Sequence, residues 1–174
     1  MDTSSSPWTQ LATECQAEGL TPQNSEKIGA ELARVFQVKL DEVGILRLAK
    51  DSLVFVHPAK LHQVGSIPLN SSTSAAVRTF NSRRPEINNS FAKTKHTSFF
   101  EMVETAKNAE SKSSKGSKII QKLMSVPVIA AGKSTGVLQI CRKGATVEQA
   151  GPDFTPADLQ TLVNAASTLG KCFR

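Results

Sequence analysis

The sequence has few of the residues from which metal sites and disulfide frameworks are built. Among its 174 residues are three histidines and three cysteines, Cys15, Cys141 and Cys172. The cysteines are an odd number without CxxC spacing, and the histidines form no HxH, HExxH or HxxxH pair. We therefore expect free buried thiols, no metal ion and no identifiable cofactor.

Long apolar runs are also missing. None approaches the roughly 20 residues that a helix needs to cross a bilayer, and residues 1–7 lack both the basic start and the apolar core of a secretory signal. We expect a cytoplasmic protein without a membrane segment. A single domain of this length buries roughly 70% of its unfolded surface, so one globular core is expected.

Positive charge is concentrated in the middle of the sequence. The range 60–122 holds eleven lysines and arginines against four acidic residues, while the net charge of the whole chain is +6. Such a bias attracts anions, including nucleic acid. Several of these lysines, however, lie in the Ser-rich range 109–118, which has no aromatic residue for base stacking. We interpret this range as a solvated loop, which disfavours nucleic-acid binding.

Three helix starts are marked by a hydroxyl residue followed by proline, a pairing that suits the N-cap and the first helical position. They are Ser6-Pro7, Thr21-Pro22 and Thr155-Pro156. Helices are therefore predicted over 7–18, 22–37 and 156–173, each with one apolar stripe. The first forms an N-terminal extension, residues 1–20, ahead of a domain over 21–174.

Two hairpins are predicted between these helices. The runs 43–49 and 53–56 form the first, and 123–131 and 137–143 the second, joined by a turn at 132–136 in which Gly136 takes a positive φ. Ser72 or Thr73 is expected to cap a short helix, and further short elements are predicted at 85–88 and 99–105. This order of elements predicts an α+β domain with a mostly antiparallel sheet.

Three stretches of the C-terminal third resemble the GAF family: Ser125–Val128 with Gly132, Gly136–Ile140, and Phe154-Thr155-x-x-Asp158-Leu159. Upstream, residues 74–77 and 84–87 resemble the helix and short strand of that family's pocket wall. The resemblance implies a PAS-related central antiparallel sheet. N- and C-terminal helices pack on one face, and short helices and loops cover a ligand pocket on the other.

The motifs of the family's cyclic-nucleotide, bilin and methionine-sulfoxide subclasses are missing, so no catalytic residue is assigned. The resemblance implies a polar, weakly basic pocket in which Arg78 and His96 could hold an anionic group. Its candidate ligand-binding residues are Asn70, Ser72, Ser74, Arg78, Asn88, Asn89, Phe91, His96 and Ser98. The alternative is that these residues form loops and caps and bond to backbone.

The sequence thus favours a non-catalytic sensory or regulatory module. It would bind a small molecule, with an anionic one as the candidate, and/or transmit a signal through a homodimer of its terminal helices. The alternative is a ligand-free interaction or dimerisation module whose pocket is filled by its own side chains. A thiol-dependent reductase is the least favoured of the three.

Overall fold

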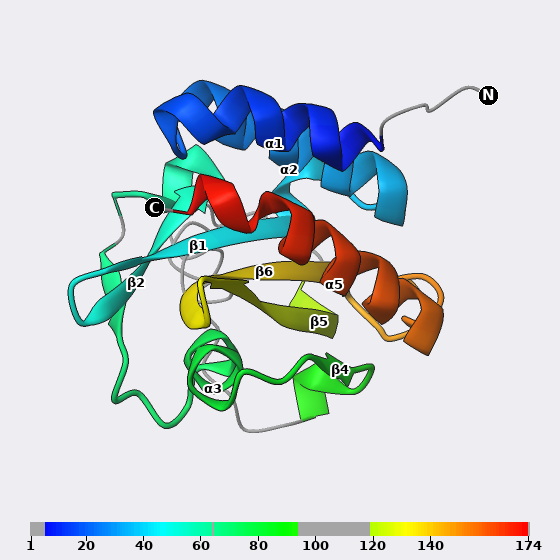
Figure 1. Cartoon of the computed structure of the whole chain (residues 1–174). Helices are drawn as coiled ribbons and strands as arrows, with labels where there is room; N and C mark the ends of the chain where they lie inside the picture. Colours follow the sequence, from blue (N-terminus) through cyan, green and yellow to red (C-terminus); the bar gives the residue numbers. More distant parts are fainter. Residues whose placement is uncertain (1–5, 64, 94–118, 174) are drawn as a thin grey trace.

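The computed structural model describes residues 6–63, 65–93 and 119–173. Its centre is a six-stranded antiparallel sheet in the order β3-β2-β1-β6-β5-β4 (Figure 1). The strands are β1 Val43–Ala49, β2 Ser52–His57, β3 Ser66–Pro68, β4 Glu86–Asn88, β5 Ile119–Ala130 and β6 Lys133–Gly144. Both predicted hairpins, β1-β2 and β5-β6, are present.

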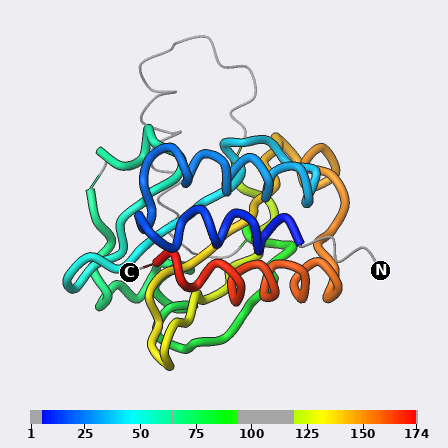
Figure 2. Tube along the Cα trace, turned by 45° about the horizontal axis from the view of Figure 1, so that its top comes forward, coloured from blue at the N-terminus to red at the C-terminus, as the bar shows by residue number. Residues whose placement is uncertain are grey.

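Helices cover both faces of this sheet. On one face lie α1 (Pro7–Glu18), α2 (Pro22–Phe36) and α5 (Pro156–Leu169), while α3 (Ala75–Ser82) lies on the other (Figure 1). Helices α2 and α5 contact the strands, and α1 contacts both helices, so the three run side by side (Figure 2). The predicted α+β architecture, with terminal helices on one face of an antiparallel sheet, is confirmed.

The helix starts follow from their caps. Ser6 and Thr21 cap α1 and α2. At α5, Thr155 Oγ1 accepts the Asp158 N–H at 3.1 Å and Asp158 Oδ2 accepts the Thr155 N–H at 2.8 Å, which completes a capping box. The last helix ends at Leu169, earlier than predicted, because a turn of 3-10 helix follows and carries Phe173 into the core.

The prediction for the second hairpin turn was wrong. Strands β5 and β6 extend further than expected and meet in a two-residue turn, Ala131-Gly132, with φ values of 50° and 76°. Gly136 lies inside β6, opposite Arg47 of β1. A Cβ there would collide with the Leu46 carbonyl oxygen and fall 2.5 Å from Phe173 Cδ1. Glycine is therefore required for close packing, not for a turn.

Helix α3 begins later than predicted. Its N-cap is Ser74, whose Oγ accepts the Val77 N–H at 3.3 Å, whereas Ser72 and Thr73 are exposed residues ahead of the helix. The helix begins at Ala75 because its buried face starts there and continues through Val77. The predicted helix over 99–105 and loop over 109–118 lie outside the described residues.

The sheet separates two hydrophobic clusters. The cluster under the helix layer includes the apolar stripes of all three long helices, with Trp8 9%, Ile28 0%, Leu32 0%, Leu162 0% and Leu169 0% exposed. These stripes are used within the chain. The homodimer was predicted from these stripes, but they are buried in the core of the chain and do not lie on the outer surface of α1, α2 and α5.

Candidate functional site

The face of the sheet under α3 is the one on which a ligand pocket was expected from the sequence, and we call it the α3 face. Its buried apolar side chains are no more than 8% exposed, and they come from the strands, from α3 and from the 3-10 turns Ala59–Leu61 and Phe91–Lys93. They are Leu46, Leu53, Phe55, Leu61, Ile67, Ala75, Ala76, Val77, Phe80, Phe91, Ile120, Leu123, Val137 and Cys141.

Three buried polar side chains interrupt this apolar face. Thr79 and Ser125 are 0% exposed and Gln139 is 5% exposed. Thr79 Oγ1 lies 2.9 Å from the Ala75 carbonyl oxygen, which can only accept, so Thr79 donates to it. Ser125 Oγ, 2.8 Å away, must then donate to Thr79, and it accepts Gln139 Nε2 at 3.2 Å. The result is a directed chain of hydrogen bonds from β6 through β5 to α3.

Sequence reasoning did not single out this polar chain as a site. One signal was available in β6, where Gln139 occupies the middle of the alternation Val137, Gln139, Cys141, whose other two members are apolar and buried. Thr79 and Ser125 carried no comparable signal, because they meet only when α3 packs over β5.

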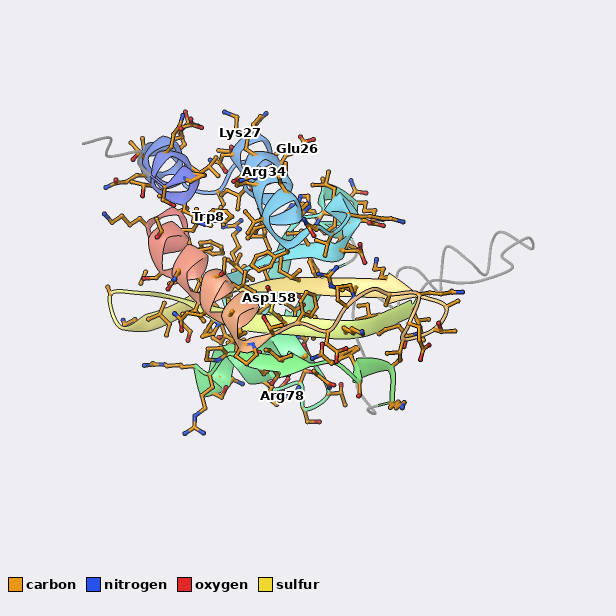
Figure 3. All side chains as sticks on the ribbon, turned by 90° about the vertical axis from the view of Figure 1, so that its right-hand side faces the viewer. Trp8, Glu26, Lys27, Arg34, Arg78 and Asp158 are labelled. Atoms are coloured by element: carbon orange, nitrogen blue, oxygen red, sulfur yellow. The ribbon has the colours of Figure 1, made fainter. Side chains whose placement is uncertain are left out.

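Of the predicted ligand residues, Arg78 lies at the edge of the α3 face, on the side of the sheet opposite the helix layer (Figure 3). It pairs with Glu86 of β4 through two bonds, Nη2 to Oε1 at 2.6 Å and Nε to Oε2 at 3.1 Å. The hydrogen bonds to Glu86 raise the pKa of Arg78 above its ordinary value. The guanidinium thus ties α3 to β4.

The predicted asparagines bond to backbone. Asn88 Oδ1 accepts the Ser90 N–H at 2.9 Å. Asn89 holds both polar groups of one residue ahead of α5, donating Nδ2 to the Phe154 carbonyl at 3.0 Å and accepting the Phe154 N–H at 2.9 Å. Asn89 therefore fixes the approach to the last helix.

The remaining predicted residues divide into three groups. Asn70 and Ser72 are exposed in the connection before α3. Ser74 caps that helix, and Phe91 is buried in the α3 face. His96 and Ser98 lie outside the described residues. The structure thus places Ser74, Arg78 and Phe91 around one sheet face, where the first two form internal bonds.

The three cysteines are buried thiols that form no disulfide bond. Cys15 of α1 and Cys172 are hydrogen-bonded to each other, and the Cys172 thiol lies 3.9 Å from the Ala12 carbonyl oxygen. Burial, together with the neighbouring Cys15, raises the pKa of Cys172 to about 12. A catalytic thiol needs a lowered pKa and access to substrate, so this pair lacks both properties.

Cavities lined by described residues also lie away from the α3 face. One, of about 510 Å³, has apolar walls beside His57, Leu40 and Pro58. His57 is 5% exposed and its Nε2 donates to the Leu40 carbonyl at 3.1 Å. Burial lowers the pKa of this imidazole. Another cavity, of about 680 Å³, is polar and surrounds Arg142 and Lys143.

The described residues offer neither a metal-ion site nor a membrane-spanning helix. Within residues 6–63, 65–93 and 119–173, no three His, Cys, Asp or Glu side chains are grouped so that they could hold a metal ion. Among the helices of these same ranges, none is long and apolar enough to span a membrane.

No protein-family model and no curated protein matches the sequence. Several solved structures, however, share this fold over most of the length of the chain. The GAF domain of an Acinetobacter phosphoenolpyruvate-protein phosphotransferase has a TM-score of 0.65 at 14% identity, covering 99% of this chain and 94% of that one. Residues 122 to 287 of a methyl-accepting chemotaxis protein also give 0.65 at 14% identity, covering 94% of each.

A third similar structure is the GAF domain of a two-component sensor histidine kinase from Bacillus halodurans. Its TM-score is 0.57 at 18% identity, covering 84% of this chain and 91% of that one. The fold of this protein is therefore GAF-like, as the sequence resemblance implied. At these identities the likeness establishes the fold alone, so function must be argued from the chain's own residues.

Proposed function

We propose that this protein is a non-catalytic sensory or regulatory module of GAF type that binds a small molecule on the α3 face. The fold is shared with domains of a sensor histidine kinase and a phosphotransferase, and with part of a chemotaxis protein. The buried cysteine pair, with a raised pKa at Cys172, supports a binding role over a thiol-dependent reaction.

The observation that carries the proposal is the hydrogen-bond chain Gln139–Ser125–Thr79 in an otherwise apolar sheet face. Small-molecule sites combine mainly apolar walls with a few placed polar groups that orient the ligand. A face that served packing alone would be simpler to build from apolar side chains, because buried polar groups must all find partners.

Native mass spectrometry of the freshly purified chain tests this proposal. We expect a co-purified small molecule that is retained by the exposed control Gln16→Leu and lost from Gln139→Leu, since only the second removes a polar group from the α3 face. If the same molecule remained bound to folded Gln139→Leu protein, or no molecule accompanied the parent chain, the α3 face would not be the binding site.

A ligand-free interaction module is the second candidate. It is favoured by the close packing of the α3 face, where every apolar member of the cluster is no more than 8% exposed. In that case Gln139→Leu should not weaken any binding and would change only the stability of the domain. The mass-spectrometric comparison above separates the two candidates.

Homodimerisation is also part of the proposal, although the apolar helix stripes no longer support it. The outer surface of α1 and α2 carries charged side chains, among them Lys27 and Arg34 of α2 (Figure 3). Lys27 pairs with Glu14 at 3.2 Å, and Arg34 pairs with Glu31. A dimer through this surface should weaken as salt rises. Sedimentation velocity at low and high salt tests it; a monomer at both would remove dimerisation from the proposal.

A further inference from the structure

A polar cavity of about 680 Å³ lies where α2 ends, β6 ends and the connection to α5 begins. Its volume falls within the range of small-molecule sites. Residues from three separate parts of the chain line it: Gln37, Val38, Lys39, Glu42, Arg142, Lys143, Gly144, Ala145, Gln149 and Ala150. We call it the Arg142 cavity.

The lining of the Arg142 cavity carries an excess of positive charge. Lys39, Arg142 and Lys143 face a single acidic lining residue, Glu42. The Glu42 carboxylate is 7% exposed, and each of its oxygens accepts a backbone N–H, from Lys39 at 2.9 Å and from Lys143 at 2.6 Å. Glu42 therefore holds the cavity wall together. Lys143 Nζ also donates to the Asp41 carbonyl oxygen at 3.3 Å, and the cations of the lining outnumber its one acidic residue.

Arg142 is held in place from two sides. Its Nη2 donates to the carbonyl of Phe36, the last residue of α2, at 3.2 Å, and its guanidinium lies 4.8 Å from the ring centroid of Phe154. Its Nε is buried and has no hydrogen-bond partner. A buried donor without a partner is unfavourable, and the fixed guanidinium belongs to a residue that lines the cavity, where its group can bind an oxyanion.

We propose that the Arg142 cavity binds a small molecule through a phosphate or carboxylate group, with Arg142 as the principal contact and Lys39 and Lys143 adding charge. Guanidinium groups pair with both kinds of oxyanion through two parallel hydrogen bonds. This site is separate from the α3 face, since no residue lining the Arg142 cavity belongs to that cluster.

The position of Arg142 gives such a ligand a structural effect. The side chain links the end of α2 to Phe154, directly before the Thr155 cap of α5. An anion bound here adds contacts at the end of β6, next to the end of α2 and the start of α5. Binding should therefore raise the thermal stability of the domain, since a ligand stabilises the state that binds it.

Calorimetric titration at low salt with inorganic phosphate, citrate and AMP tests the proposal. Phosphate and citrate show whether a phosphate or a carboxylate group alone is enough for binding. AMP shows whether the phosphate must belong to a larger molecule. At least one probe should bind, and its affinity should fall by about tenfold or more in Arg142→Gln, as expected for loss of an oriented charged contact. The matched control Arg84→Gln removes an exposed guanidinium elsewhere and should bind like the parent.

Lys39→Gln keeps the test decisive if Arg142→Gln fails to fold, because residue 39 is exposed and its loss should not disturb the core. We expect it to weaken binding several-fold, and Gln139→Leu on the α3 face to leave binding unchanged. Absence of binding by all three probes, or equal losses in Lys39→Gln and Arg84→Gln, would overturn the proposal. If no small molecule binds at the α3 face, the proposal for the Arg142 cavity is unaffected, because the two sites share no residue.

Discussion

The imidazole ring of His57 lies against Gly29 of α2 so closely that a Cβ at position 29 would fall 2.8 Å from both Cε1 and Nε2. Glycine in a helix interior lowers helix stability by about 1 kcal/mol relative to alanine. Gly29 has this lower helix propensity, but the His57 ring of β2 occupies the place that a larger side chain would need.

Gly29→Ala should therefore destabilise the protein despite the better helix propensity of alanine. Overpacking typically costs about 1–3 kcal/mol, which exceeds the gain of about 1 kcal/mol from propensity. Urea denaturation measures the difference. The double variant Gly29→Ala/His57→Ala should lose less stability than the sum of the two single variants, since the ring that clashes with the added Cβ is gone. A stabilised Gly29→Ala single variant would contradict the packing.

The stability of the fold should fall as the pH drops below about 6.5, the ordinary pKa of histidine. Burial, opposed by the bond to Leu40 and by the charge of Glu26, lowers the pKa of His57 in the folded state. The unfolded chain then takes up the proton first, so acid favours unfolding. His57→Gln should remove this part of the pH dependence in denaturant titrations. The control His62→Gln, at an exposed position, should keep it.

Gly136→Ala should cost more stability than Gly132→Ala. The first introduces a Cβ against the Leu46 carbonyl and the Phe173 ring, whereas the second meets nothing within 4 Å and only strains a φ of +76°. A strained φ costs about 1 kcal/mol, and a collision with backbone in a central strand typically costs about 1–3 kcal/mol or more. Thermal unfolding of the two variants compares them directly; equal losses would argue against the close approach.

The thiols should react with an aromatic disulfide reagent only after unfolding, because all three are buried. Burial raises the pKa of Cys172 to about 12, so the unfolded chain loses this proton first as the pH rises. Stability should therefore decline from about pH 9 towards pH 12. Cys172→Ala should weaken that decline. Rapid native labelling of the parent protein would contradict the burial.

The sequence predicted the framework of the fold because its signals are local. Thr21-Pro22 and Thr155-Pro156 specify helix starts through bonds within four residues, and the structure places both helices at those prolines. The position of Gly136 could not be interpreted in that way. Its constraint comes from Leu46 and Phe173, residues that only the folded chain brings beside it.

The candidate sites followed the same rule. Ser74 was expected near a pocket and caps α3, and its neighbour Arg78 pairs with Glu86. Neither the Ser74 cap nor the Arg78–Glu86 ion pair follows a regular spacing along the chain, so no sequence pattern indicates these partners. The positive lining of the Arg142 cavity leaves no signal in the sequence, where basic residues concentrate in the range 60–122, because its cations come from residues about a hundred positions apart.

The neighbouring strands β1 and β6 have a consequence for how this chain folds. Val43 pairs with Ile140, so the middle of the sheet joins early and late parts of the sequence. On a ribosome, β1 and β2 emerge long before β6 and leave an open strand edge that can pair with another nascent chain. We expect the last steps of folding to be slow, as in other proteins with distant contacts, and aggregation to be greatest in chains truncated before β6.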